Sequence, residues 1–128
     1  MNNTDTDYSI AEEVVKRQLE AYNAKDIDSF MATWADDALY FEHPSTLLAN
    51  GAAEIRARHI LRFKEPDLYG RLIKRTVLKN KVIDIEIVSR TFPEGPGHVE
   101  VVCIYEVENK KIAKAWFILG TPILDTKL

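Results

Sequence analysis

Residues 81–119 read KVIDIEIVSRTFPEGPGHVEVVCIYEVENKKIAKAWFIL, and they give the strongest indication of the fold class. Along most of it, side-chain character repeats with a period of two, which is typical of β-strands. Turn-forming residues interrupt the repeat at Pro93–Gly97 and at Asn109–Lys110, so we predict a hairpin at each place, the first with the longer loop. The expected strands are Lys81–Phe92, His98–Glu108 and Lys111 to about Leu124.

Upstream of this stretch the pattern changes from strands to helices. One more strand, Arg71–Lys79, is expected before a tight turn at Asn80. Before it, a helix from Gly51 to about Lys64 and a short hairpin of Ala38–His43 with Thr46–Ala49 are expected. Helices that precede a run of hairpins predict an α+β domain with a mostly antiparallel sheet.

Two further helices are expected at the N-terminal end. The sequence Ser9-Ile10-Ala11-Glu12 is a capping box, which predicts a helix from Ser9 to about Ala24. Asp26 is the expected cap of a second helix. Its apolar face has helical spacing and comprises Ile27, Phe30, Met31 and Trp34.

The composition is that of one globular domain. The chain has 128 residues, 46% of them hydrophobic. A chain of this length buries roughly two thirds of its unfolded surface and needs no disulfide or metal to fold. We expect residues 1–8 to form a disordered polar tail and residues 9–128 to form a single domain.

Several classes of function are disfavoured by the same sequence. The net charge of −3 argues against the broad basic surface needed to bind nucleic acid without sequence specificity. No apolar run approaches the roughly 18 residues of a membrane span, and the N-terminus does not resemble a secretory signal. The lone Cys103 is typical of a reducing compartment, so we predict a cytoplasmic protein. No metal-ligand spacing or nucleotide-binding loop is present, so no metal or cofactor is expected.

The last two strands carry apolar side chains on both faces. Val99, Val101, Cys103 and Tyr105 point to one side. The residues expected on the other side are Val102, Ile104, Trp116 and Ile118. Helices can cover one face, so we expect a second copy of the chain to cover the other and predict a homodimer.

The order of these elements resembles the nuclear transport factor two-like superfamily, and in particular its SnoaL-like and ketosteroid-isomerase-like small proteins. Three features carry the resemblance: the segment Trp34–Pro44, the glycine at position 51 that opens a helix, and the closing hairpin Val107–Trp116. It implies a cone-shaped curved sheet wrapped around three helices, with an apolar pocket between them. Because this fold hosts many unrelated functions, the resemblance indicates the fold more strongly than the activity.

In ketosteroid isomerase, an aspartate base, a tyrosine and a protonated aspartate carry the reaction. The resemblance places His43 at the position of the base, Gln18 at that of the tyrosine and Cys103 at that of the protonated acid. None of the three residue types is kept. The three replacements argue against steroid isomerisation itself, while a histidine near the pocket still offers a proton acceptor at neutral pH.

We predict His43 as the catalytic base, with a backbone-bonded histidine at a strand end as the alternative. The residues expected to bind the ligand are Gln18, Tyr22, Trp34, Phe41, His59, Val101, Cys103 and Phe117. Several of these also fit a purely structural role, since Gln18 can pair with His43 or a strand backbone, and Cys103 is more often a small buried residue than a nucleophile.

Charged residues on the third helix and the long strands leave alternatives open. We expect Arg56 to pair with Asp36, Asp37 or Glu42 rather than with a ligand. Asp84 and Glu86 alternate with isoleucines, and the pattern alone does not tell which set faces inward. They form a solvated strand face or, if inward, a carboxylate pair with Arg71 or Arg75, which would resemble the Asp-Arg-Asp arrangement of the superfamily's epoxide hydrolases.

The sequence thus supports a hypothesis for the function. We predict a dimeric protein that transfers a proton on an apolar carbonyl compound, as an isomerase or a cyclase, in a hydrophobic pocket. The alternatives are a non-catalytic ligand-binding protein of the same fold and an interaction module that uses its outer face.

Overall fold

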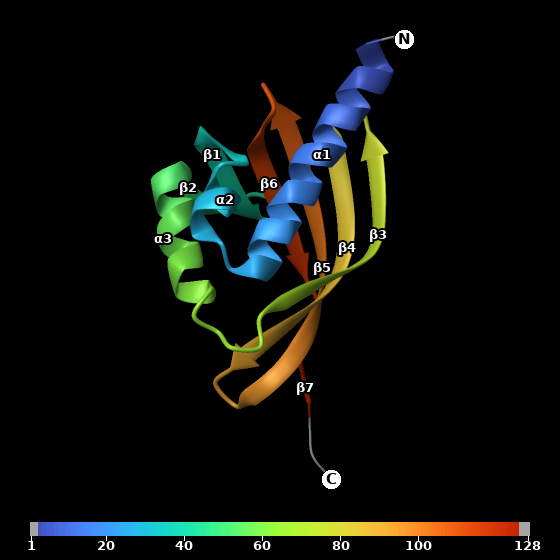
Figure 1. The fold of residues 1–128 in the computed structure, drawn as a ribbon. Coiled ribbons are helices and arrows are strands. Elements are labelled where there is room, and N and C mark those ends of the chain that lie inside the picture. The colour runs from blue at the N-terminus through green and yellow to red at the C-terminus, as the bar shows by residue number, and fades with distance from the viewer. Residues whose placement is uncertain (1–2, 126–128) are drawn as a thin grey trace.

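A computed structural model describes the backbone of residues 3–125 and the side chains of residues 8–125. Three helices in the N-terminal half accompany a curled, mostly antiparallel sheet that does not close, as predicted (Figure 1). The elements are α1 (Asn3–Ala24), α2 (Ile27–Met31), β1 (Trp34–Glu42), β2 (Thr46–Asn50), α3 (Ala52–Arg62), β3 (Tyr69–Leu78), β4 (Lys81–Phe92), β5 (Gly95–Glu108), β6 (Lys111–Leu119) and β7 (Ile123–Leu124).

The sheet has the strand order β2-β1-β6-β5-β4-β3, and β7 pairs with β5. Only the β1–β6 pairing is parallel among those described, because β1 reaches the sheet from the helical half of the chain. Figure 1 shows α1 lying along one face of the long strands, with α2 and α3 gathered on the side of β1 and β2. The concave face of the sheet is thereby covered, and the other face carries no helix.

The turns between the long strands form where the turn-forming residues predict them, but one loop is shorter than predicted. Asn109 and Lys110 both have positive φ, 52° and 63°, as a two-residue turn of type I′ requires. The β4–β5 loop is shorter than predicted, because Phe92 pairs directly with Gly95 and only Pro93 and Glu94 form the turn. The predicted loop over residues 93–97 was therefore wrong, and the difference changes which residues face each other across the hairpin.

Three other predicted boundaries need correction. Helix α1 begins at Asn3, so residues 3–8 are helical rather than a disordered tail, and residues 1–2 lie outside the described residues. Ser9 and Glu12 fit inside a helix as well as at its start, so the capping box did not mark the boundary. Trp34 begins β1 instead of ending the second helix. Strand β6 ends at Leu119, because Pro122 cannot donate to a ladder.

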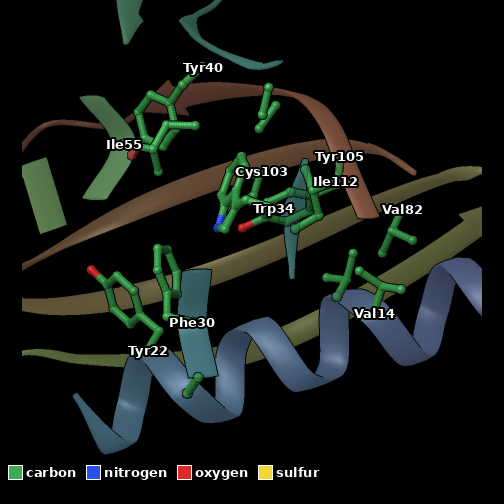
Figure 2. Close-up of a cluster of buried hydrophobic side chains, with 14 of the residues drawn as sticks. Val14, Tyr22, Phe30, Trp34, Tyr40, Ile55, Val82, Cys103, Tyr105 and Ile112 are labelled. Atoms are coloured by element: carbon green, nitrogen blue, oxygen red, sulfur yellow. The ribbon is translucent and has the colours of Figure 1, made fainter. Parts of the chain in front are cut away.

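The core lies between α1 and the concave face of the sheet. Val14 and Val15 of α1 are buried, and Val82, Tyr105 and Ile112 cover them from the strands. Figure 2 shows Val14 and Tyr22 of α1 pointing toward the side chains of the sheet. Within the described part of the chain, no helix is long and apolar enough to cross a membrane.

The outer face of the sheet is apolar over four neighbouring strands. Cross-strand pairing sets Phe41, Trp116, Ile104 and Ile83 in one row. The next row holds Ile118, Val102 and Ile85. Phe41 stacks on Trp116 with the ring centroids 5.6 Å apart, and 42% of Ile118 is exposed. An uncovered apolar face of this extent is a feature of interaction surfaces.

Gly97 allows β7 to lie against β5, and its substitution provides a test of this packing. A Cβ atom at this position would lie 2.5 Å from the carbonyl oxygen of Ile123 and 3.0 Å from the ring of Phe92. We expect Gly97→Ala to lower the free energy of unfolding by roughly 1–3 kcal/mol, because backbone must move to admit the methyl group. Urea denaturation measures this, with Glu94→Ala in the exposed turn as the control. An equal effect of the two substitutions would contradict the close approach.

Candidate functional site

A pocket opens between the concave face of the sheet and helices α1 and α3. It encloses about 750 Å³ of empty space, including the part that is open to solvent. Seven of the nine residues predicted for the site line it: Gln18, Tyr22, Trp34, His59, Val101, Cys103 and Phe117. The helical and sheet residues that were expected to meet around a ligand are therefore brought together.

The other two predicted residues, His43 and Phe41, lie outside this pocket. His43 is exposed after the end of β1, and its backbone N–H donates to the carbonyl oxygen of Phe117. Phe41 belongs to the outer face, where it stacks on Trp116. Instead Tyr40 and Glu42 point inward from β1, so the prediction chose the wrong side of this strand. Both of its sides carry aromatic residues, and alternation alone could not separate them.

Strand β4 turns its acidic residues toward the interior. Asp84 is fully buried, and both of its carboxylate oxygens accept hydrogen bonds from the Arg75 guanidinium, at 2.7 and 2.9 Å. Glu86 is 4% exposed and lines the pocket. Of the two arrangements that the sequence left open, the structure has the inward one, with Arg75 rather than Arg71 as the partner.

The pKa of Glu86 is raised to about 7. Burial is the main cause, and the nearby Asp84 carboxylate adds to it, whereas the Cys103 thiol and the Arg75 charge act in the opposite direction. At neutral pH this carboxyl group is therefore divided between its acidic and basic forms, which is the condition for transferring protons in both directions.

Cys103 lies on the adjacent strand, and its thiol acts against burial by lowering the pKa of the Glu86 carboxyl. Burial raises the pKa of the thiol well above its usual value, and the Glu86 charge raises it further. Cys103 is therefore a neutral thiol near pH 7 and is a poor nucleophile.

His59 is buried among aromatic rings behind the pocket wall. Its Nδ1–H donates to the carbonyl oxygen of Ile55 at 2.8 Å, and its ring lies 4.5 Å from that of Phe30, centroid to centroid. Burial lowers the pKa of His59 to about 3, so the ring is neutral at physiological pH. This histidine is a packing residue that presents a neutral surface to the pocket.

Four buried polar atoms have no hydrogen-bond partner among the described residues: Gln18 Oε1, Trp34 Nε1, Arg58 Nε and Glu86 Oε2. All four belong to residues that line the pocket. The expected pairing of Gln18 with His43 or a strand backbone is thus not seen for its oxygen. A buried polar group without a partner costs about 1–3 kcal/mol, so their clustering indicates a place where a polar molecule binds.

Arg56 was predicted to form a structural ion pair, and it does, but with a different partner. Its guanidinium donates to Asp28 of the α2 segment at 2.6 Å, not to Asp36, Asp37 or Glu42. The prediction missed this partner because the α2–α3 contact depends on how the two helices pack, which local spacing does not reveal.

The SnoaL-like domain family matches residues 15–115, which is most of the chain. The chain belongs to the SnoaL-like family. The resemblance to the nuclear transport factor two-like superfamily is thereby confirmed.

Several solved structures share this SnoaL-like fold. An uncharacterised cystatin-fold protein from Novosphingobium aromaticivorans has a TM-score of 0.78 and 24% identity, over 84% of this chain and 97% of that one. A proposed polyketide cyclase from Sinorhizobium meliloti has a TM-score of 0.69 and 21% identity, over 82% and 93%. A proposed ketosteroid isomerase from Kribbella flavida has a TM-score of 0.77 and 12% identity, over 95% and 86%. No curated protein matches the sequence.

Sequence reasoning missed part of this SnoaL-like site. Besides Tyr40 and Glu42, the pocket is lined by three arginines, Arg58, Arg62 and Arg90, to which the sequence assigned no role in ligand binding. Glu86 pairs across the hairpin with Val101, which was expected to face inward, but this register follows from the two-residue β4–β5 turn and not from the predicted loop. Among the described residues, no group of three or more histidine, cysteine or acidic side chains is placed to hold a metal ion.

The raised pKa of Glu86 predicts how stability depends on pH. An unfolded glutamate loses its proton near pH 4.5, whereas the folded protein holds it until about pH 7. As pH rises through this window the folded state is therefore destabilised relative to the unfolded one, by roughly 3 kcal/mol in total. We expect Glu86→Gln to remove this loss, so that the variant gains stability over the parent protein from about pH 5 to 8.

Denaturation at a series of pH values measures the difference. Glu100→Gln on β5 is the matched control, because Glu100 is exposed and should leave the pH dependence as it is. A difference between Glu86→Gln and the parent protein that stays constant with pH would show that the Glu86 pKa is not raised.

Proposed function

We propose that this protein is an enzyme that transfers a proton on an apolar carbonyl compound, as an isomerase or a cyclase, with Glu86 as the acid–base group. The observation that carries the proposal is the Glu86 carboxyl itself, which is buried in the pocket wall with its Oε2 atom unpartnered and its pKa near 7. Glu86 takes the role that the sequence had assigned to His43.

The chemistry follows from this acid–base balance. A carboxylate of normal pKa is a weak base in water. A carboxylate whose pKa lies near the working pH is a stronger base, and a large fraction of it is still ionised and able to accept a proton. After abstraction from the carbon next to a carbonyl, the same group returns the proton to another atom of the ligand. Burial stabilises the protonated form of the carboxyl group, as in other active sites where a carboxyl group acts as an acid near neutral pH.

A proton abstracted next to a carbonyl leaves negative charge on the carbonyl oxygen, and a donor must stabilise it. The Trp34 indole Nε1–H is buried, has no partner among the described residues, and belongs to the pocket wall. It is a donor only, so it suits a carbonyl oxygen. The unpartnered Gln18 oxygen is an acceptor and suits a hydroxyl or amide group of the ligand.

The rest of the wall supports an apolar ligand. Val88, Val99 and Val101 line it from β4 and β5, and the rings of Tyr22, Tyr40 and Phe117 line it from the other sides. The similar structures named as a polyketide cyclase and a ketosteroid isomerase support an enzyme of this general kind through their shared fold.

The proposed proton transfer can be tested without knowledge of the true substrate. Enzymatic abstraction next to a carbonyl exchanges that hydrogen for deuterium in D₂O, and NMR detects the exchange. We expect the protein to speed this exchange in at least one of a panel of apolar cyclic ketones, and Glu86→Gln to slow it by about 100-fold or more, since general bases contribute roughly 10²–10⁴-fold.

Glu100→Gln is again the control and should leave the exchange rate unchanged, because Glu100 is exposed on the next strand. Exchange that survives Glu86→Gln would overturn the role of Glu86. Ketones that bind to the pocket without any exchange would indicate instead the non-catalytic ligand-binding protein.

We also propose that a second copy of the chain covers the outer face of the sheet. This face lacks a helix, and its apolar rows run across β1, β6, β5 and β4. A twofold axis over such a sheet pairs the same rows from both copies, which makes the surface complementary to itself. The burial of Trp116 and Ile118 in the contact would supply most of the stabilisation.

A charge in the centre of this face should prevent the proposed contact. We expect the parent protein to sediment as a dimer at micromolar concentration and Ile118→Lys to sediment as a monomer, because the ammonium group would be buried against apolar side chains. Ile60→Lys is the matched control, since Ile60 on α3 is 43% exposed and Ile118 is 42% exposed. A parent protein that is monomeric in the same experiment would overturn the proposal.

A further inference from the structure

Three arginines meet at one end of the pocket. Arg58 and Arg62 lie one turn apart on α3 and so share a face of the helix, and Arg90 reaches the same pocket from β4. Glu86 also lies on β4, but its charged neighbours are Asp84 and Arg75 rather than these three arginines. The pocket therefore has an acidic end and an arginine end.

The three guanidinium groups differ in whether a carboxylate of the protein already pairs with them. Arg90 donates two hydrogen bonds to the Glu65 carboxylate, at 2.8 and 2.7 Å, and is neutralised by it. Arg58 lies over the Tyr40 ring, 5.4 Å from its centroid, and its buried Nε–H has no partner among the described residues. No ion pair with a described residue is found for Arg62 either. Arg58 and Arg62 thus retain donors and charge toward the pocket.

The positive field of this end acts on the pocket wall. Burial is the main cause of the low pKa of His59, and the charges of Arg62, Arg58 and Arg90 each lower it further. Burial raises the pKa of Tyr22, which Arg62 and Arg90 partly oppose. The carboxylate of Glu42 also lines the pocket, but on an exposed residue, where water screens its charge. The largely buried Glu65 carboxylate near this end is paired with Arg90 and does not line the pocket, so among the described residues the buried lining groups here are neutral or cationic.

We propose that Arg58 and Arg62 bind a carboxylate group of the ligand, so that the ligand is an amphipathic acid whose apolar body lies along the aromatic wall. Guanidinium groups bind carboxylates through charge-assisted hydrogen bonds, which are stronger than neutral ones. The carboxylate would satisfy the buried Arg58 Nε–H and would place the apolar body toward Glu86. This inference deepens the proposed function and rests on it in one respect, namely that the pocket binds an apolar molecule.

A matched pair of probes tests the arginine end. Naphthylacetate and naphthylacetamide share an apolar ring system and differ in the carboxylate, and isothermal titration measures the affinity of both. We expect the acid to bind more tightly than the amide, and Arg58→Gln and Arg62→Gln each to weaken the acid by about tenfold while changing the amide by less than about twofold. The preference for the acid should also shrink as salt is added.

Arg56→Gln is the control, because Arg56 lies on the same helix outside the pocket and pairs with Asp28. It removes the same charge and should leave both affinities unchanged, and circular dichroism verifies that all variants are folded.

Equal binding of the acid and the amide, or an equal loss in Arg56→Gln, would overturn the arginine site and leave the proton-transfer function standing. A preference for the acid that depends on Arg58 and Arg62, with no deuterium exchange in any ketone, would support the site and overturn the catalytic function. Failure of both probes to bind would overturn this site, and the exchange experiment would still decide the function separately.

Discussion

The buried ion pair of Arg75 and Asp84 is the interaction on which the site depends. Asp84 has no exposed surface, and such a charge is tolerated only with a partner of good geometry. Arg75 supplies it through two hydrogen bonds from the neighbouring strand β3. The pair therefore joins the edge strand β3 to β4 and at the same time keeps a carboxylate in the interior.

That charge has a consequence for the next inward residue of the same strand. Glu86 follows Asp84 at the β-strand period, so both carboxyl groups point to the same side. Burial and the Asp84 charge together raise the pKa of Glu86. Glu86 has no arginine paired with it as Arg75 is paired with Asp84. Two neighbouring acids therefore have different environments: Asp84 is held in an ion pair, and Glu86 exchanges protons near neutral pH.

The strands were predictable from the sequence because their apolar periods are long and their turns contain strong turn formers. The orientation of the site was harder to predict, and the β4–β5 turn shows why. A loop over residues 93–97 would pair Phe92 with His98 and would set Cys103 on the side of the isoleucines of β4. The two-residue turn shifts the register by an odd number and sets Cys103 opposite Asp84 instead. Since one step of register exchanges the two faces of a strand, a small error in loop length hid the acidic residues.

The faces of β1 could not be told apart for a related reason, since Tyr40 and Phe41 are both aromatic and the segment is short. Contacts between helices decided the remaining residues. On α3, three arginines lie within seven positions of each other, yet Arg56 binds Asp28 while Arg58 and Arg62 reach the pocket. Helical spacing predicts that Arg56 points away from Arg58 and Arg62, but only the packing of α2 and β1 against α3 determines what each of them meets.

The polar groups of the pocket are distributed in a way that gives a bound molecule a direction. The sheet supplies a carboxyl group that is largely protonated below pH 7, and the helix supplies guanidinium groups that are charged at every physiological pH. Beside the arginines, the His59 ring is neutral and lies against the rings of Tyr22 and Tyr40, so this part of the wall adds no negative charge. A ligand with one anionic end and one apolar end gains most when its anion lies at the arginines, because the reverse orientation would bring two negative groups together in a site of low dielectric. The Asp84 charge, which adds to burial in raising the pKa of Glu86, therefore also disfavours a ligand anion at this end of the pocket.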